Sequence, residues 1–381
     1  MSGTLNPRGV AVLAHRWAGL VIGALWAMQG LTGALLVFQP QLERLARRPF
    51  STARLASLDQ LTDAAQAAAG APISRLALPD RAVGVVNADY LDVGGKRRFV
   101  RLDAESAKVI AVTASAPGVA APATGWGWVR SIHERALLSQ GGAGLIAASG
   151  AFLITGVLIG AWLGWPRPGK WRVSFDVARW RNPAQRRYGW HRAVGLLAAG
   201  PLVIIAGTGV YMAILGLNPS RAVPAVLTAP PIGPQRAYEI AHARFPEAVF
   251  SSLQFPAQPR GVYAVRLTQP TEARRRSGRT IVEVDARTGR TAKIYDPLNA
   301  PLAARLSDLV LPIHYGGVAG LIGMVLVAAA GLSLPALYGL GLWIWLVRRG
   351  VLGRRNKARF AEGTTPENEH LVLKILFLDR L

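Results

Sequence analysis

Four of the six histidines in this 381-residue chain stand next to long uncharged runs, and they form two similar pairs. His15 in "AHRWAGL" and His191 in "WHRAVGL" each precede such a run and are each followed by an arginine. His133 in "SIHERALL" and His314 in "PIHYGGVAGL" precede the two other runs. Imidazole binds transition-metal ions and haem iron, so the pattern predicts a metal or haem protein.

The four uncharged runs are long enough to cross a membrane as helices, because about 18–20 apolar residues span the hydrocarbon core of a bilayer. We expect transmembrane helices at residues 17–38, 141–165, 193–219 and 317–347. Pro335 predicts a kink or a tilt in the last of them. No small-residue cleavage site follows the first run, so we interpret it as a retained helix rather than a signal peptide.

The net charge of +23 is concentrated in short segments beside these runs. Residues 167–192 contain eight Lys and Arg against one Asp, and "RRGVLGRRNKAR" follows the last run. Such segments are typical of the cytoplasmic side, where they attract anionic membrane lipid, so we expect no nucleic-acid partner. The segment "ERLARR" at 43–48 is an exception, because it is basic but follows the first run on the predicted outer side. The predicted cytoplasmic segments are 1–16, 166–192 and 348–381, which include both termini, and the predicted outer segments are 39–140 and 220–316.

The two halves of the chain repeat one plan. "SLDQLTDAAQAAAG" and "GPQRAYEIAHARF" have helical spacing, and each is followed by alternating runs that are typical of strands. The closing hairpins "VRLDAESAKV" and "VEVDARTGRT" align, with Asp103 opposite Asp285. The sequence therefore predicts an α-helical membrane protein with four transmembrane helices in two parallel repeats, each with an extracytoplasmic α+β module of one helix on a small antiparallel sheet.

This topology places the histidines at two depths, with His15 and His191 near the cytoplasmic face and His133 and His314 near the outer face. Repeat symmetry predicts that the members of each pair face each other. Haem suits such pairs better than a bare ion, because the chain has no Cys and the runs contain no Asp or Glu, whereas haem iron needs only two axial ligands. Glycines in the runs would leave a slot for a flat ring. Two strong ligands leave no open position on the iron, which favours electron transfer over oxygen activation.

Other residues could contribute to these sites. Arg16 and Arg192 follow the inner histidines and could pair with haem propionates, although basic anchors at the cytoplasmic face explain them equally well. His242 and His370 have no counterpart in the other half, so we interpret them as ordinary surface or core residues. Aromatic residues of the outer modules are candidate contacts for a substrate, although aromatic residues near a membrane interface are more often belt or core residues. They are Trp126, Trp128, Tyr263 and Tyr295.

The motifs "HRWAGL" and "HRAVGL", together with "IHERALL" and "IHYGGVAGL", resemble those of the PepSY-associated transmembrane helix family, from about residue 10 to residue 350. The family includes iron-regulated proteins of the bacterial inner membrane and ferric-siderophore reductases, among them reductases of ferrioxamine-type chelates. The resemblance implies PepSY-like outer modules and two b-type haems, held by His15 with His191 and by His133 with His314. It also implies delivery of electrons to a ferric siderophore in the periplasm. Only His314 is followed by a glycine-rich segment, so the outer slot is predicted to be asymmetric.

One added electron would loosen an oxygen-donor siderophore, because hard oxygen ligands hold ferric iron better than ferrous iron. Two haems at different depths could relay electrons across a core of about 30 Å. The inner side carries no dinucleotide-binding fingerprint, so the electron donor is expected to be a membrane quinol or a cytoplasmic reductase. Two alternatives stay open: a haem-free, membrane-anchored PepSY module that binds or regulates another protein, and a metal transporter, against which the lack of acidic residues in the runs argues.

Overall fold

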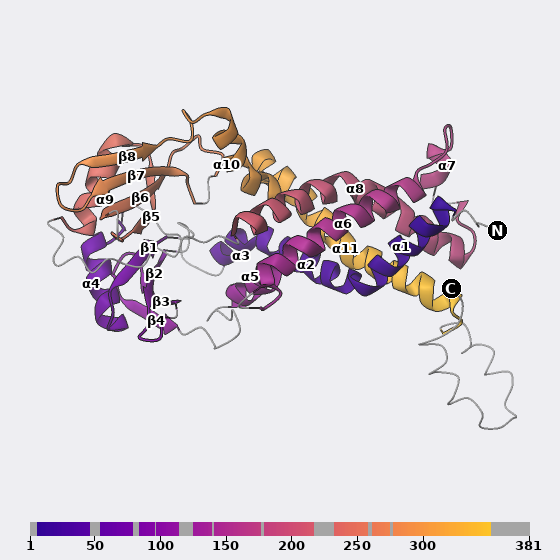
Figure 1. Cartoon of the computed structure of the whole chain (residues 1–381), viewed down its shortest axis with the longest axis horizontal. Helices are drawn as coiled ribbons and strands as arrows, with labels where there is room; N and C mark the ends of the chain where they lie inside the picture. Colours follow the sequence, from indigo (N-terminus) through magenta and orange to yellow (C-terminus); the bar gives the residue numbers. More distant parts are fainter. Residues whose placement is uncertain are drawn as a thin grey trace, which may run out of the picture.

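The computed structural model describes residues 6–45, 54–78, 84–95, 97–113, 125–138, 141–176, 179–216, 232–257, 261–274 and 277–351. An elongated bundle of helices carries a domain with a β-sheet at one end (Figure 1). The start of α1 (Pro7–Val21), the short helix α7 (Trp171–Phe175) and the end of α11 (Gly320–Arg348) lie at the other end of the bundle. His370 lies outside the described residues.

The bundle contains the helices that are long and apolar enough to cross a membrane. Three of them meet this criterion alone: α6 (Gly142–Gly164), α8 (Pro183–Gly216) and α11. Helices α1 and α2 (Gly23–Val37) meet it together, as a pair bent by 60°. The described part of the chain therefore has three candidate membrane spans, or four if the bent pair is one span.

Two helices begin earlier than the predicted spans: α1 begins at Pro7 rather than at residue 17, and α8 begins at Pro183 rather than at residue 193. Asn182 starts it as a capping residue, because its side chain accepts a hydrogen bond from the backbone N–H of Gln185 (2.8 Å) and proline favours the first helical position. The basic residues of the predicted loop thus extend the helix beyond its apolar part. Helix α11 continues through Pro335 without a break, and the bent pair of α1 and α2 meets at Ile22.

The strands form one eight-stranded antiparallel sheet rather than the two small sheets that the sequence predicts. Its order is β4-β3-β2-β1-β5-β6-β7-β8, so each outer module contributes four consecutive strands and the modules join where β1 pairs with β5. The strands are β1 (Ile73–Ala77), β2 (Val85–Leu91), β3 (Arg97–Asp103), β4 (Val109–Thr113), β5 (Val249–Gln254), β6 (Val262–Thr268), β7 (Thr280–Asp285) and β8 (Thr291–Tyr295).

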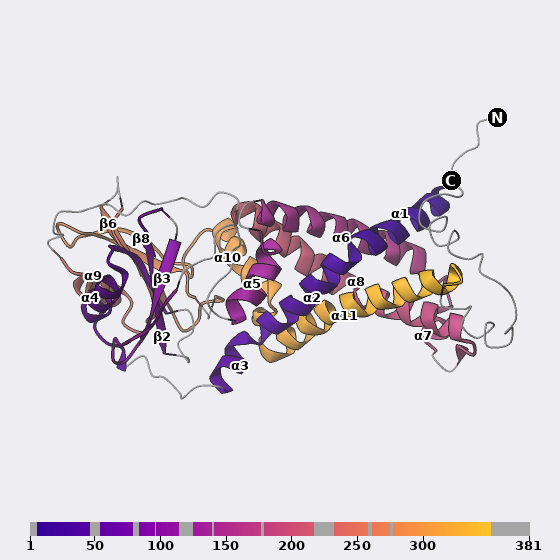
Figure 2. The same cartoon turned by 90° about the horizontal axis from the view of Figure 1, so that it is seen from below.

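One face of the sheet is covered by two helices, α4 (Leu58–Ala69) and α9 (Pro234–Arg244). A capping box of Ser57 and Gln60 starts α4, and Gly70 ends it with a left-handed φ of 62°. Leu61 and Ala65 are one turn apart on α4 and are buried in the core that these helices form with the sheet. Figures 1 and 2 both place α4 and α9 on the side of the sheet away from the bundle, so the other face of the sheet turns toward the bundle.

The two hairpins that align in the sequence have the same turn geometry. The Oδ1 atom of Asp103 accepts a hydrogen bond from the backbone N–H of Ser106 (2.9 Å), and that of Asp285 accepts one from Thr288 (2.8 Å). In both turns these backbone hydrogen bonds are the main cause that lowers the pKa of the aspartate.

Short helices lie where the sheet domain meets the bundle: α3 (Gln39–Leu45), α5 (Gly125–Arg135), α10 (Leu302–His314) and the 3₁₀ turn η3 (Gly317–Ala319). Helix α10 is bound to the sheet through Asp308, which accepts hydrogen bonds from Arg279 Nε (2.7 Å) and from the Tyr295 hydroxyl (2.6 Å). Helix α5 is bound to α2, because Gln29 Nε2 donates to the backbone carbonyl of His133 (2.9 Å).

Glycines allow the membrane helices to approach closely. Helices α2 and α11 meet where a Cβ atom on Gly30 would overlap the backbone carbonyl of Gly331. Helices α6 and α8 meet where a Cβ atom on Gly150 would lie 2.7 Å from a methyl group of Val210. Small residues at such contacts bring helix backbones into direct van der Waals contact, which is the main attraction between helices in a membrane.

We predict that Gly30→Val destabilises the bundle, because the new side chain would push α2 away from α11. Overpacking at such a contact costs about 1–3 kcal/mol, which should lower the midpoint of thermal unfolding of the detergent-purified protein, followed by circular dichroism. Gly19→Val is the matched control, because a Cβ atom at Gly19 meets nothing within 4 Å. Equal midpoints for the two variants would show that this contact does not stabilise the bundle.

Candidate functional site: two opposed histidine pairs

The first pair, His15 and His191, lies at the end of the bundle remote from the sheet. His15 belongs to α1, and His191 lies near the start of α8, next to α7. Their ring centres are 6.2 Å apart, with the ring planes at 79°. The structure thus brings together two imidazoles that belong to different halves of the sequence.

The second pair, His133 and His314, lies at the end of the bundle near the sheet. His133 is in α5, and His314 is the last residue of α10. Their ring centres are 6.3 Å apart, with the ring planes at 56°. All four side chains are half-buried, so each pair is enclosed by protein but not sealed off completely.

A backbone carbonyl of a neighbouring helix holds Nδ1 in three of the four histidines. A carbonyl oxygen can only accept a hydrogen bond, so Nδ1 carries the proton and the lone pair of Nε2 is free to bind a metal. Such an anchor also fixes the orientation of the ring. The hydrogen bonds join His15 to Gly156 (3.0 Å), His133 to Gln29 (3.1 Å) and His314 to Ile205 (3.0 Å).

A threonine hydroxyl adds a second contact in the outer pair. Thr32 Oγ1 lies 3.2 Å from Nδ1 of His133, and Thr208 Oγ1 lies 3.0 Å from Nδ1 of His314. Each hydroxyl donates its own proton to the carbonyl four residues earlier in its helix, at 2.8 Å in both cases. The hydroxyl oxygen is therefore available to accept from the imidazole N–H. The N–H of each outer histidine thus has two acceptors, a backbone carbonyl and a threonine hydroxyl.

His191 is the exception among the four. Its Nδ1 is buried near the backbone carbonyl of Leu337 but makes no hydrogen bond of good geometry within the described residues. An unpaired polar atom inside an apolar bundle is costly, so this ring is held less firmly than the other three.

A glycine lies against the Cε1 edge of every one of these rings. A Cβ atom added to the glycine would lie 2.6–3.5 Å from that edge, so a side chain would displace the ring or the helix at the two shortest contacts, would fit tightly at the third and would only touch the ring at the longest. The positions are Gly160 against His15 (2.6 Å), Gly33 against His133 (2.9 Å), Gly209 against His314 (3.1 Å) and Gly341 against His191 (3.5 Å).

These supporting residues recur along the chain with the same spacings as the histidines. The two halves therefore build the surroundings of their histidines from corresponding positions. The interval in sequence between His15 and His191 also separates Gln29 from Ile205, Thr32 from Thr208 and Gly33 from Gly209. The slightly longer interval between His133 and His314 also separates Gly156 from Leu337 and Gly160 from Gly341.

The spacing of each pair fits two axial ligands of one metal ion. An imidazole nitrogen binds a first-row metal at about 2.0–2.1 Å, and the ring centre lies roughly 1.1 Å further away, so two opposed rings have centres about 6.3 Å apart. The observed 6.2 and 6.3 Å match this value. Nowhere in the described residues do three or more His, Cys, Asp or Glu gather. Two protein ligands suit haem iron, whose porphyrin supplies four nitrogens, better than a bare ion.

The two arginines next to the inner histidines have different surroundings. Arg16 is exposed, with its guanidinium 5.7 Å from the ring of Trp17. Arg192 is half-buried and donates to the backbone carbonyl of Ser174 (2.8 Å), while its Nε atom is buried without a partner in the described part of the chain. Arg192 is therefore the better placed of the two to bind an anionic group inside the protein.

The remaining candidates from the sequence fall into different parts of the molecule. Tyr263 is 1% exposed and donates to the carbonyl of Ile232 (3.2 Å), so its prediction as a substrate contact is wrong. Its alternation with Val265 and Leu267 along β6 is the sequence signal for a core position. Trp128 is exposed on α5, and Trp126 is half-buried there.

Sequence reasoning missed the threonines, and it predicted a slot lined by glycines without identifying those that contact the rings. The signal was present: each of His15 and His191 is followed, after the same interval, by a Thr-Gly dipeptide, at 32–33 and at 208–209. Their role depends on α5 and α10 packing back against α2 and α8, which the hydrophobic pattern of the spans does not reveal.

Comparison with curated proteins gave no match. The profile of the PepSY-associated TM region family matches residues 12–348, a stretch that contains all four paired histidines, the membrane helices and the whole sheet. The chain is therefore a member of the PepSY-associated TM region family of membrane proteins.

Proposed function

We propose that this protein is a dihaem electron-transfer protein of the bacterial inner membrane that reduces a ferric siderophore on the outer side and releases ferrous iron. The observation that carries the proposal is the pair of opposed histidines at each end of the bundle, with the ring spacing of two axial ligands of one metal ion. Membership of a membrane-protein family and the apolar helices agree with it at a coarser level.

The inner site would use Nε2 of His15 and His191, and the outer site Nε2 of His133 and His314. A b-type haem bound in each site would supply reversible one-electron transfer at two depths of the membrane. The protein's part is to hold the ligands. The carbonyls on Nδ1 fix the tautomer and make the ring a stronger donor, and the glycines keep the space beside each ring clear. Arg192 is our candidate for a propionate partner at the inner site, with Arg16 at its margin.

We place the sheet domain in the periplasm and the α7 end of the bundle in the cytoplasm. The segment around α7 carries Arg167, Lys170 and Arg172, and short basic segments beside membrane helices stay inside. In this orientation the protein crosses the membrane several times, and the start of α1 and the end of α11 both lie on the cytoplasmic side.

The proposed reaction transfers one electron to the ferric ion of the chelate, which becomes ferrous. Oxygen donors hold the ferrous ion less tightly, so iron is released and no bond of the siderophore is broken. The electron comes from a membrane quinol or from a cytoplasmic reductase, which keeps the reductant on the opposite side of the membrane from the chelate.

We predict that the purified protein shows the reduced absorption bands of six-coordinate b-type haem, with two haems per chain. His15→Ala and His191→Ala should each remove one haem, and His133→Ala and His314→Ala should each remove the other, because one axial ligand alone holds haem weakly. Dithionite-reduced minus oxidised spectra and haem extraction measure the outcome.

His242→Ala is the matched control and should keep both haems, since His242 lies on α9, where its ring contacts Tyr238 (5.4 Å between centres). A colourless protein from haem-replete cells would overturn the proposal and favour a haem-free PepSY module that binds or regulates another protein. Loss of the same haem in His15→Ala and His314→Ala would show that the pairs are assigned wrongly.

We further predict that Thr208→Val raises the midpoint potential of the outer site and leaves the haem content unchanged. The substitution removes one acceptor from the N–H of His314, which makes the ring a weaker donor and disfavours the ferric state. Loss of part of such a hydrogen bond corresponds to about 20–60 mV. Redox titration followed by absorbance measures it, with Thr155→Val, whose hydroxyl bonds only its own helix, as the control. An unchanged or lower potential in Thr208→Val would contradict the prediction.

A further inference from the structure

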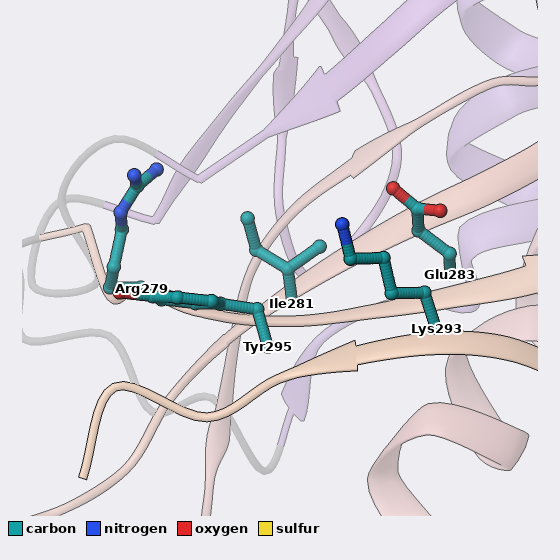
Figure 3. Close-up of a pocket in the computed structure, with 5 residues that line it drawn as sticks. All are labelled: Arg279, Ile281, Glu283, Lys293 and Tyr295. Atoms are coloured by element: carbon teal, nitrogen blue, oxygen red, sulfur yellow. The ribbon is translucent and has the colours of Figure 1, made fainter. Parts of the chain in front are cut away.

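Arg279 lines two pockets on the face of the sheet that turns toward the bundle. The first, of about 200 Å³, lies over β7 and β8. In Figure 3, Arg279 stands at one end of this pocket and Lys293 beside Glu283 at the other, with Ile281 between them. The second, of about 160 Å³, lies between the segment before β7 and helix α10 and is lined by Arg274, Arg279 and Arg305, together with Glu272 and Asp308.

The two carboxylates of the second pocket are engaged from within the protein. Glu272 is 1% exposed and accepts hydrogen bonds from the backbone N–H groups of Arg279 and Thr280 and from the Thr280 hydroxyl. Asp308 accepts from Arg279 Nε and from the Tyr295 hydroxyl. The pocket is lined by three arginines and these two carboxylates, so its lining keeps a net positive charge.

Arg274 and Arg305 are the two guanidinium groups of the pocket that form no ion pair within the described residues. The buried Nε atom of Arg274 also has no hydrogen-bond partner among them. Arg305 projects from the exposed side of α10 into the same pocket. A guanidinium presents a fork of donors that matches a carboxylate, so two unpaired ones in a concave site suit an anion with several oxygens.

The surroundings of the pocket reinforce its positive potential. Burial, followed by the charges of Arg279, Arg75 and Arg274, lowers the pKa of Arg266 to about 10. Burial and then the charge of Arg279 also lower the pKa of Arg274. Burial is the main cause of both shifts, and the neighbouring guanidinium groups add to it.

We propose that the pocket of Arg274, Arg279 and Arg305 binds an anionic, oxygen-rich ligand, and that this ligand is a ferric chelate of net negative charge, such as a polycarboxylate complex. The identity of the ligand as a chelate rests on the proposed function, whereas the anion site does not. The inference differs from the ferrioxamine type implied by the family resemblance, because the ferric complex of linear desferrioxamine B carries a positive terminal ammonium group that these arginines would repel.

The location of the pocket agrees with this role. Asp308 and Arg305 precede His314 on the same helix by six and nine residues, which correspond to roughly 9 and 14 Å along the axis. A ligand bound there would lie beside the helix that carries an outer histidine.

Gallium(III) citrate tests the inference without any electron transfer, because gallium(III) mimics ferric iron but is not reduced. We expect the full-length protein in detergent to bind gallium citrate in isothermal titration calorimetry, and to bind the cationic gallium complex of desferrioxamine B at least about 10-fold more weakly. Arg274→Gln and Arg305→Gln should each weaken gallium citrate binding roughly 10-fold to 100-fold. Both leave the Arg279–Asp308 contact in place, so melting temperature and haem content should stay unchanged.

Arg236→Gln is the matched control, because it removes an exposed arginine from α9 on the opposite face of the sheet and should not alter binding. Equal binding of gallium citrate by the wild type and both pocket variants, or a preference for the desferrioxamine complex, would overturn the inference. Nanodiscs with and without phosphatidylglycerol separate a lipid headgroup from a soluble chelate. Competition by phosphatidylglycerol that disappears in Arg274→Gln would make the pocket a lipid site and overturn the chelate assignment.

The two proposals fail independently. Normal gallium citrate binding by a protein without haem would leave the anion site standing and remove the reductase. If the protein holds two haems and reduces the chelate but does not bind gallium citrate in this pocket, the reductase would stand and the anion site would be removed.

Discussion

The hydrogen bond from an imidazole N–H to a carbonyl of a neighbouring helix is the interaction on which the rest of this structure depends. A helical carbonyl already accepts one backbone N–H, and its second lone pair can take the imidazole without breaking the helix. The bond fixes which nitrogen is protonated and therefore which one can bind a metal. It forms only if the two helices approach closely, which explains the glycine beside each ring, as at Gly160 and Gly33.

The two halves meet this constraint with different side chains. In the first half, Gly156 offers its carbonyl to His15, and the ring of Trp26 packs at 3.5 Å from where a Cβ atom on Gly156 would stand. The position that corresponds to Gly156 in the second half is Leu337, and the position that corresponds to Trp26 is Leu202. A glycine and a tryptophan are thus replaced by two leucines. The inner histidine of the second half is also the one whose Nδ1 has no hydrogen-bond partner in the described residues, and we attribute this to the leucine that replaces Gly156.

The sequence was sufficient for features that depend on length and repetition. The apolar runs indicated the membrane helices, and the recurrence of the His-Arg motif at the start of each half was enough to pair His15 with His191. It was insufficient where contacts are distant in the chain. The joining of β1 to β5 into one sheet depends on two strand edges that look alike, since nothing local distinguishes an edge that stays open from one that pairs. Helices α5 and α10 were noted only for their histidines, because short amphipathic segments beside a membrane span carry a weak periodic signal.

The fused sheet has a consequence for the outer histidine pair that two separate modules would lack. His314 ends α10, which Asp308 binds to β8 and to the residue before β7, whereas α5 is bound to the bundle through the backbone of His133. The outer pair therefore joins His314, which is positioned by the sheet and also by Ile205 of α8, to His133, which is positioned by the membrane helices, while both inner histidines come from the bundle. Asp308 is mostly buried, and a buried carboxylate left without its arginine is strongly unfavourable, so this link is stiff. The position of His314, whose ring centre lies 6.3 Å from that of His133, thus depends on contacts with the sheet domain as well as with the bundle.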